Sequence, residues 1–517
     1  MALISVSNLT FAYEGGYENI FENVSFQMDT SWKLGFTGRN GRGKTTFLNL
    51  LLGKYEYSGN ITKSVNFEYF PYRVGETYDE NTIDVLNDIL RVNGSLSTTE
   101  WMILRELSLL EVPESVLYRP FATLSGGEQN KVLLAGLFLR ENNFLLIDEP
   151  TNHLDMSGRE VLGRYLKTKS GFILVSHDRA LLDDCIDHIL SINRANIEIQ
   201  SGNFSSWWEN KRRQDNFELT ENRRLKSDIK RLSAAARRVS GWSDAIESSK
   251  NMGNNKIRQN EGVGKLDRGY IGHKAAKMMK RSKSIEARKL TAIEEKSSLL
   301  KNIENSDELM ICQERYHTNT LLSFENVSIY YDSDTPVCQN ISFTVERGDR
   351  VLLSGRNGSG KSSILKLVCG ENLGALRYSG EFKSGSRLKI SYVPQGTSFL
   401  KGILSDYALD NSLDESLFKA VLRKLDFSRV QFEKDMSDFS AGQKKKVLLA
   451  KSLYEVAHLH VWDEPLNFID IISRIQIEEL ILEFKPTMLI VEHDRMFCKK
   501  TTTKQLTMHN AQCIMHN

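Results

Sequence analysis

The chain has 517 residues, which is enough for two or three domains with separate hydrophobic cores. Its 68 Lys/Arg and 66 Asp/Glu give a formal net charge of +2, so the total charge indicates no particular partner. The six cysteines form no CxxC pair, which argues against a zinc site. The N-terminus resembles no signal peptide, and the apolar runs are far shorter than the roughly 20 residues of a membrane-spanning helix. We therefore expect a cytoplasmic protein that does not enter the membrane.

The first motif in chain order is GRNGRGKTTFLNLL at 38–51, which fits the phosphate-binding pattern G-x-x-x-x-G-K-[ST]. It follows a strand-like run and precedes a helix-like run, which is the context that such a loop requires. Backbone N–H groups and the positive end of the following helix meet phosphate oxygens there. Lys44 is predicted to reach the β- and γ-phosphates, and the Thr45 hydroxyl to bind Mg²⁺. The other predicted ATP-binding residues of this loop are Gly38, Asn40, Gly41, Gly43 and Thr46.

Two further blocks of the first half point to the same chemistry. LSGGE at 124–128 predicts a helix whose small first residues, Ser125, Gly126 and Gly127, leave a serine hydroxyl and backbone N–H groups free for an anion. FLLIDEP at 144–150 predicts a buried parallel strand that ends in acids.

These acids have separate predicted roles. Asp148 suits Mg²⁺, and Glu149 is placed to polarise a water aimed at the γ-phosphate. His177 follows another apolar strand and is predicted to hold that water or to contact the γ-phosphate.

The middle of the chain is basic. Residues 211–289 contain 22 Lys/Arg and nine Asp/Glu, which favours a polyanionic partner over the ordinary alternative of solvated helical faces. Apolar spacing predicts two long helices, and a segment rich in Gly and Asn separates them. The first seam runs through Leu225, Ile229, Leu232, Ala236 and Val239, and the second through Met278, Ile285, Ala292 and Leu299. We expect an antiparallel helical hairpin with a basic tip at about 241–273, and 30 helical residues would reach roughly 45 Å.

The motifs of the first half return after this insert, in the same order and at offsets of 315 to 317 residues. Such regular self-similarity indicates a tandem duplication. Lys361 and Ser362 take the predicted roles of Lys44 and Thr45. The other predicted binding and catalytic residues of this half are Gly355, Asn357, Gly358, Gly360 and Ser363 in the loop, Ser440, Ala441 and Gly442 in FSAGQ, Asp463 (for Mg²⁺) and Glu464 in LHVWDEP, and His493 in VEHDR.

A phosphate loop, an LSGGQ-like signature, an acid-ended strand and a histidine in this order resemble the ATP-binding cassette (ABC) ATPases. The resemblance implies an α/β fold: two tandem ABC-type P-loop nucleotide-binding domains, 1–204 and 321–517, joined by a long antiparallel helical hairpin at 205–320. It implies that the two cassettes pair head to tail within a monomer, so that each ATP lies between the P-loop of one cassette and the signature of the other. Tyr13 and Tyr331 match the residue that stacks on adenine. ATP and Mg²⁺ are the implied cofactors, and both sites are expected to hydrolyse ATP because both glutamates are present.

The two halves also differ from this family pattern. Gln395 in YVPQ matches a family glutamine that contacts Mg²⁺, whereas YFPY in the first half has Tyr72 there. Tyrosine is a poorer ligand for Mg²⁺ and water, which predicts slower hydrolysis at the first site. Ala441 replaces the first signature glycine, and NFID lacks the leucine of NHLD. We expect two unequal sites.

MMKRSK at 278–283, together with IGHKAAKMMKRSK, LYRPFATLSGGE and VWDEPLNFID, resembles the ABC-F proteins. Within them it resembles the ribosome-protecting resistance branch of Lsa/Vga type, which acts against lincosamides, streptogramin A and pleuromutilins. The implied partners are the 70S ribosome at its E site, 23S rRNA and P-site tRNA, with no membrane partner. The predicted RNA-facing linker residues are Lys256, Arg258, Lys265, Leu266, Arg268, Tyr270, His273, Lys277, Lys280, Arg281 and Lys283.

Three alternatives stay open at this point. The first is a translation factor of the same family that rescues stalled ribosomes without conferring resistance. The second is the ATPase subunit of a membrane exporter, which the basic hairpin argues against. The third is a DNA-repair ATPase, which the absence of zinc modules and of longer coiled coils disfavours.

Overall fold

The structure is a computed structural model that describes residues 3–15, 19–92, 95–96, 100–140, 142–193, 196–218, 220, 224, 227, 230, 310–311, 313–331, 335–370, 376–509 and 512–516. The chain divides into a compact unit of residues 1–207 and 307–517 and a second unit of residues 208–306. The first unit contains both cassettes. The predicted tip loop, both predicted linker seams and the predicted RNA-facing residues from Lys256 to Lys283 lie outside the described residues. The predicted domain boundaries stay predictions.

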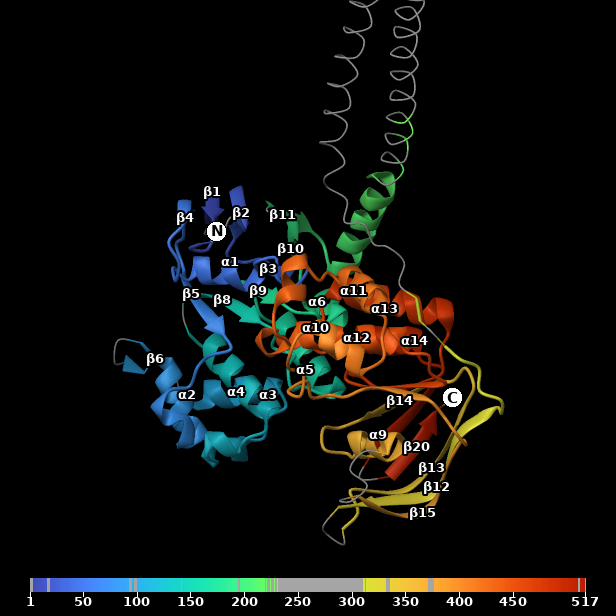
Figure 1. Ribbon diagram of the computed structural model, residues 1–517. Helices are drawn as coiled ribbons and strands as arrows, with labels where there is room; N and C mark the ends of the chain where they lie inside the picture. Colours follow the sequence, from blue (N-terminus) through green and yellow to red (C-terminus); the bar gives the residue numbers. More distant parts are fainter. Residues whose placement is uncertain are drawn as a thin grey trace, which may run out of the picture. The chain divides into compact units, whose positions relative to one another are not determined.

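The first cassette contains a six-stranded sheet, a three-stranded sheet, the short two-stranded sheet β6-β7 and the helices that pack against them (Figure 1). Its strands are β1 (Leu3–Phe11), β2 (Phe21–Asp29), β3 (Lys33–Thr37), β4 (Ser58–Thr62), β5 (Asn66–Phe70), β6 (Arg91–Val92), β7 (Ser95–Leu96), β8 (Asn143–Asp148), β9 (Phe172–Val175), β10 (His188–Asn193) and β11 (Asn196–Ser201). Its helices are α1 (Lys44–Leu51), α2 (Thr82–Leu90), α3 (Glu100–Leu109), α4 (Gly126–Phe138), α5 (Met156–Lys167) and α6 (Arg179–Cys185), with 3₁₀ turns η1 (Glu76–Asp79), η2 (Glu114–Tyr118) and η3 (Phe121–Thr123).

The larger sheet has the order β11-β10-β3-β9-β8-β5 and is parallel except for β11. The three-stranded sheet, β2-β1-β4, is antiparallel. Helix α1 packs between them, because the ring of Phe47 meets Phe21 of one sheet and Phe36 of the other at centroid distances of 5.9 and 5.5 Å. The phosphate-loop helix is therefore fixed by one continuous core.

The second cassette repeats this architecture. Its strands are β12 (Thr320–Tyr330), β13 (Cys338–Glu346), β14 (Arg350–Gly355), β15 (Arg377–Ser384), β16 (Ile390–Val393), β17 (Leu459–Asp463), β18 (Met488–Val491), β19 (Lys504–His509) and β20 (Gln512–His516). Its helices are α9 (Lys361–Cys369), α10 (Leu404–Asp410), α11 (Glu415–Lys424), α12 (Ala441–Tyr454), α13 (Ile471–Phe484) and α14 (Arg495–Thr501), with 3₁₀ turns η5 (Arg429–Glu433) and η6 (Met436–Asp438). The sheets have the orders β16-β17-β18-β14-β19-β20 and β13-β12-β15.

The parallel strands bring the predicted motifs to one edge of each larger sheet. In the first cassette Val175 lies beside Phe36 on one side and Asp148 on the other. Residues 38, 149 and 177 come next along these three strands, so the phosphate loop, the acids and the histidine converge at the carboxyl edge. The predicted buried strands and the helices after both phosphate loops are confirmed. Both helices begin after a glycine with φ of +91°, and a Cβ on Gly43 would lie 2.6 Å from Ile20.

Among the described residues, no helix is long and apolar enough to cross a membrane.

Candidate active sites

The first site is built on the carboxyl edge of the first cassette. The Lys44 ammonium donates to the carbonyls of Gly38 and Arg39, at 2.7 and 3.1 Å, inside the phosphate loop. Thr45 donates from Oγ1 to Oδ2 of Asp148 at 3.1 Å. The two residues predicted to hold Mg²⁺ in this cassette are therefore in direct contact.

Glu149 leaves strand β8 in a left-handed conformation, with φ of 50°, and its N–H donates to the carbonyl of Val175 at 2.8 Å. Its carboxylate lies 3.5 Å from Nε2 of His177. Burial and the neighbouring Asp148 raise the pKa of Glu149 to about 7, against the lowering effect of Arg474 and Lys44. Burial and nearby cations also hold the pKa of His177 well below its usual value, so this imidazole is neutral.

The second site repeats the geometry with different electrostatics. Lys361 donates to the carbonyls of Gly355 and Arg356, both at 2.8 Å. Glu464, with φ of 47°, lies 3.6 Å from Nε2 of His493. Burial acts to raise the pKa of Glu464, but His493 and, more weakly, Gln395 and Lys445 lower it to about 2.

Each phosphate loop contacts the opposite cassette. Asn40 donates from Nδ2 to the carbonyl of Phe468 at 2.9 Å, and Asn357 donates to the carbonyl of His153 at 3.2 Å. Phe468 and His153 hold equivalent positions in NFID and NHLD, and both have positive φ, 63° and 66°. A Cβ on Gly442 would lie 3.4 Å from Asn40, so the second signature approaches the first phosphate loop. This is the head-to-tail pairing that the resemblance implies.

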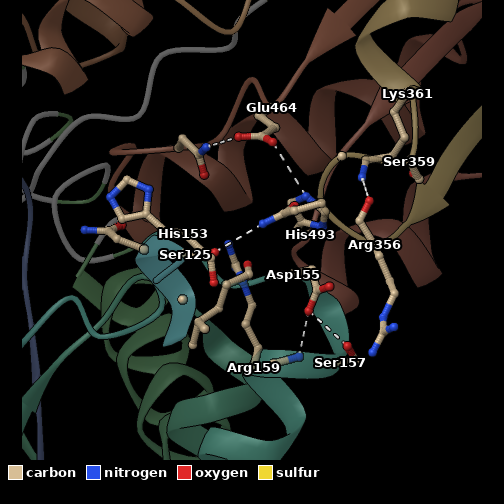
Figure 2. A pocket seen from close by; sticks show the side chains of 18 of the residues that line it. Ser125, His153, Asp155, Ser157, Arg159, Arg356, Ser359, Lys361, Glu464 and His493 are labelled. Atoms are coloured by element: carbon tan, nitrogen blue, oxygen red, sulfur yellow. Dashed lines mark hydrogen bonds and ion pairs between the residues drawn. The ribbon is translucent and has the colours of Figure 1, made fainter. Parts of the chain in front are cut away.

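A cavity of about 1070 Å³ lies at the second site and is lined by both cassettes (Figure 2). Figure 2 shows Lys361, Glu464 and His493 on one side of it and Ser125, His153 and Asp155 on the other. The predicted site residues among its lining are Ser125, Gly126, Gly127, Asn357, Gly358, Gly360, Lys361, Ser362, Ser363, Gln395, Ala441, Glu464 and His493.

Buried polar atoms without hydrogen-bond partners mark both sites. Within the described residues, Oε1 of Glu149, Oδ1 of Asp463 and Nε2 of His493 are in this condition. Leaving such atoms unpaired is costly, and a bound ligand can satisfy them. Carboxylate and hydroxyl oxygens are the donors that Mg²⁺ takes, so the residues present fit a nucleotide with Mg²⁺.

The two tyrosines matched to adenine stacking take equivalent positions. Tyr13 pairs its hydroxyl with Oγ1 of Thr46 at 2.8 Å, and Tyr331 pairs with Oγ of Ser363 at 3.1 Å. Tyr13 keeps 45% of its surface exposed, so its ring is accessible to a base.

The signature helices begin where predicted, but the Ser125 hydroxyl is not free as expected. It donates to the Glu128 carboxylate at 2.8 Å, and that carboxylate also accepts from the Ser125 N–H at 2.9 Å. The reason is a capping box, in which the acid three residues on satisfies the first residue of the helix. At Ser440 the partner is neutral Gln443, which accepts from the Ser440 N–H at 2.9 Å.

Tyr69 is a site residue that the sequence analysis missed. Its hydroxyl donates to Oδ2 of Asp148 at 3.0 Å. Tyr72, which holds the glutamine position, instead has its pKa raised by burial and by Asp88, with Arg140 opposing. Tyr69 belongs to β5, whereas Tyr72 follows that strand, and no motif in the sequence marked Tyr69.

Comparison with known proteins agrees with this geometry. The family model described as ABC transporter matches residues 21–152 and 338–467, slightly more than half of the chain. The chain belongs to this family. As an ABC protein with two ATP-binding domains, it is an ATPase.

Two curated relatives extend the similarity to nearly the whole ABC chain. ATP-binding protein Uup of Buchnera aphidicola subsp. Schizaphis graminum is 25% identical over 519 residues, covering 98% of this chain and 80% of Uup. Ribosome protection protein VmlR of Bacillus subtilis is 25% identical over 516 residues, covering 98% of this chain and 87% of VmlR. They support the resemblance to ABC-F-type ATP-binding proteins. The archaeal ribosome recycling factor aABCE1, in a crystal structure with stalk protein aP1, shares the fold with a TM-score of 0.60, 17% identity, and coverage of 97% of this chain and 87% of its own.

Proposed function

We propose that this ABC ATPase is a ribosome-protecting ABC-F protein. Two ATP molecules close the cassettes, and the closed form binds the E site of the 70S ribosome. The linker then extends towards P-site tRNA and the peptidyl-transferase centre and dislodges antibiotics of the lincosamide, streptogramin A or pleuromutilin type. Hydrolysis reopens the cassettes and releases the protein. ATP acts here by binding the closed state more tightly than the open state.

The observation that carries this proposal is the alignment with VmlR, a ribosome protection protein, over 98% of the chain. It spans both cassettes and the linker between them. The excess of 22 basic over nine acidic side chains in residues 211–289 supports an RNA partner, because cations that neutralise phosphates release counterions.

The site residues divide the chemistry between them. Thr45 and Asp148 in the first site, and Ser362, Asp463 and Gln395 in the second, would hold Mg²⁺, which supplies positive charge against the phosphates when bound. Glu149 and Glu464 orient the attacking water and take its proton, and His177 and His493 lie beside them. Lys44 and Lys361 lie inside the phosphate loops, where their ammonium groups would bind the transferred phosphate.

The two ends of the linker, which we call its roots, are bonded to different cassettes. This supports the role of the linker as a lever. On the first side, Asp183 of α6 accepts from the N–H and hydroxyl of Ser205, at 2.7 and 2.5 Å, where a helix over 204–218 begins. On the second side, Glu314 donates its N–H to the carbonyl of Ala457 at 3.0 Å, and Tyr316 donates to the carbonyl of Ser386 at 2.9 Å. A movement of one cassette relative to the other therefore moves the two roots relative to each other.

The test is a Glu149→Gln plus Glu464→Gln chain, which keeps the size of both side chains and removes both carboxylates. With ATP it is expected to stay closed and to co-sediment with 70S ribosomes at modest salt, whereas the unaltered chain is released. If the double variant stays in the supernatant, the ribosome proposal fails. Restoring Glu149 and Glu464 one at a time shows which site controls release.

The two other functions lead to different outcomes. A translation factor would also be trapped on ribosomes, but its expression would leave drug susceptibility unchanged. We expect expression to raise the inhibitory concentration of at least one of the three drug classes. An exporter subunit would co-sediment with membranes that carry its partner rather than with ribosomes.

A further inference from the structure

Helix α12 of the second cassette contains a buried cation that the roles above leave unused. Lys445 keeps only 2% of its surface exposed. Its ammonium donates to three backbone carbonyls: Pro394 at 2.8 Å, Gln395 at 3.3 Å and Asp463 at 3.1 Å. An ammonium has three donors, so this side chain is fully paired by main-chain atoms.

The three acceptors belong to two catalytic segments of the second site. Pro394 and Gln395 follow strand β16, and Asp463 ends strand β17 just before Glu464. Lys445 thus connects the Gln395 loop, through hydrogen bonds, to strand β17, which carries Asp463 at its end. Hydrogen bonds from a charged donor are about twice as strong as neutral ones, which suits this purpose.

The N-terminus of helix α12 faces the first site. Ser440 caps α12, and Gly442 approaches Asn40 of the first phosphate loop. Lys445 follows Ser440 by five residues, about 8 Å along the helix axis. One rigid helix therefore contacts the first site at its beginning and the catalytic segments of the second site less than two turns later.

The first cassette has a different contact at this position. Aligning LSGGEQN with FSAGQKK places Asn130 opposite Lys445. Asn130 donates from Nδ2 to the carbonyl of Asn152 at 2.8 Å, in the loop that follows its own catalytic strand. The pseudo-symmetry of the two cassettes is broken here by one residue.

We propose that Lys445 is a positioning residue of the second site, and that through α12 it couples nucleotide binding at the first site to the placement of Gln395 and Asp463. The proposal rests on the site assignment made above. It predicts that helix α4 provides no equivalent connection, because Asn130 makes no corresponding bridge to the loop of Tyr72 among the contacts of its amide described above.

The experiment uses a Glu149→Gln chain, in which the second site alone hydrolyses ATP. Lys445→Asn installs the residue of the first cassette, and Lys445→Met keeps the length of the side chain while removing its donors. Both are expected to lower kcat about 10- to 100-fold, as small misplacements of catalytic groups do. KM for ATP should change less than about threefold, because the lost contact orients groups rather than binds nucleotide. Lys444→Asn is the matched control: Lys444 is the half-buried neighbour, and its amine donates to the Ser437 carbonyl at 3.1 Å.

Amide hydrogen exchange gives a second measurement that does not use activity. Exchange over residues 390–396 should rise in Lys445→Met and stay unchanged in Lys444→Asn. The coupling is tested without altering Lys445 in a Lys361→Ala chain, whose second phosphate loop lacks its amine. There ATP at the first site should slow exchange over 390–396, and unchanged exchange overturns the coupling even if the Lys445 variants do not fold.

The experiments distinguish a failure of the site assignment from a failure of the role proposed for Lys445. If Glu464→Gln added to Glu149→Gln leaves hydrolysis intact, the site assignment fails and the proposal with it. If that double variant is inactive while folded Lys445→Asn and Lys445→Met keep their kcat and their exchange over 390–396, the site assignment stands and the role of Lys445 is overturned.

Discussion

Glu149 and Glu464 occupy the same position at the ends of equivalent strands, and each donates its backbone N–H to the neighbouring strand, at 2.8 and 2.9 Å. Their pKa values nevertheless differ, at about 7 for Glu149 and about 2 for Glu464. Burial acts on both, but His493 lowers the pKa of Glu464, while Asp148 raises that of Glu149. Two sites with the same catalytic residue thus hold its proton with different strength.

Tyr69 gives the residue-scale prediction, because its hydroxyl holds the Asp148 carboxylate at 3.0 Å. Tyr69→Phe, in a Glu464→Gln chain that hydrolyses only at the first site, should weaken apparent Mg²⁺ affinity about 10-fold or more, as losing a partner of a metal ligand does. Mg²⁺ titration of hydrolysis and Mn²⁺ binding measure it. Tyr72→Phe is the control, and a larger effect there than at Tyr69 would restore Tyr72 to the glutamine role.

Short sequence motifs correctly predicted the site residues whose positions are set by the backbone around them. The phosphate loops, Asp148 and the signature helices are fixed by short motifs within one cassette, so spacing was sufficient. Tyr69 and Lys445 act through contacts between segments 18 to 79 residues apart in the chain, and no local pattern marks them. The small residues around Ser125 predict a free hydroxyl, but the acid three residues later in the same helix accepts its hydrogen bond.

At the scale of elements, helix α6 connects a site to the linker root. Asp178, beside His177, caps the helix by accepting from the Leu181 N–H at 3.1 Å. At the other end Asp183 accepts from Ser205, where the next helix starts. The helix has only seven residues, so a displacement at one end is carried to the other.

Asp183→Ala removes both bonds to Ser205 and should loosen this junction by about 1–3 kcal/mol, since two donors lose a charged acceptor. We expect faster amide exchange over 204–208 and weaker ATP-dependent retention on ribosomes. Basal ATP hydrolysis should stay within about twofold, because Asp183 contacts no predicted site residue in the hydrogen bonds above. Asp187→Ala, which removes the acceptor of the Lys33 N–H at 3.0 Å, controls for the loss of an acid nearby. Equal exchange in the two variants would argue against α6 as the connection.

The interface between the two cassettes has two edges, each marked by an ion pair between an arginine of one cassette and a glutamate of the other. The two pairs differ in how deeply they are buried. Arg179 of α6 pairs with Glu478 of α13 at 2.5 Å, with side-chain exposures of 6% and 4%. At the equivalent edge Arg495 pairs with Glu160 at 3.2 Å, with exposures of 62% and 51%. Figure 1 shows α6 close to α13 and α14, at the edge where Arg179 pairs with Glu478. Repeat alignment does not predict this, because Gly163 is the counterpart of Glu478.

Glu478→Ala leaves Arg179 buried without its closest partner, which costs about 3–5 kcal/mol, whereas Glu160→Ala removes an exposed pair worth about 1 kcal/mol or less. Urea unfolding should resolve the difference. Since the buried pair joins the cassettes, Glu478→Ala should also weaken ATP-dependent closure, measured by small-angle scattering. Matching effects from the two variants would show that burial of the pair does not matter.

The buried Arg179–Glu478 edge also contributes to the acid sensitivity of the protein. Burial acts to raise the pKa of Asp494, but Arg474 at 3.1 Å, together with Arg179, lowers it below its ordinary value. A carboxylate with a lowered folded pKa stabilises the protein above its unfolded pKa of about 4, and this contribution is lost as the pH falls below that value. The melting temperature should therefore respond to this group little between pH 5 and 7 and fall steeply below pH 4. Asp494→Asn should be less stable at pH 7 and show a shallower acid slope, while Asp410→Asn, at an exposed aspartate, should follow the unaltered chain. An unchanged slope in Asp494→Asn would place the acid sensitivity elsewhere in the molecule.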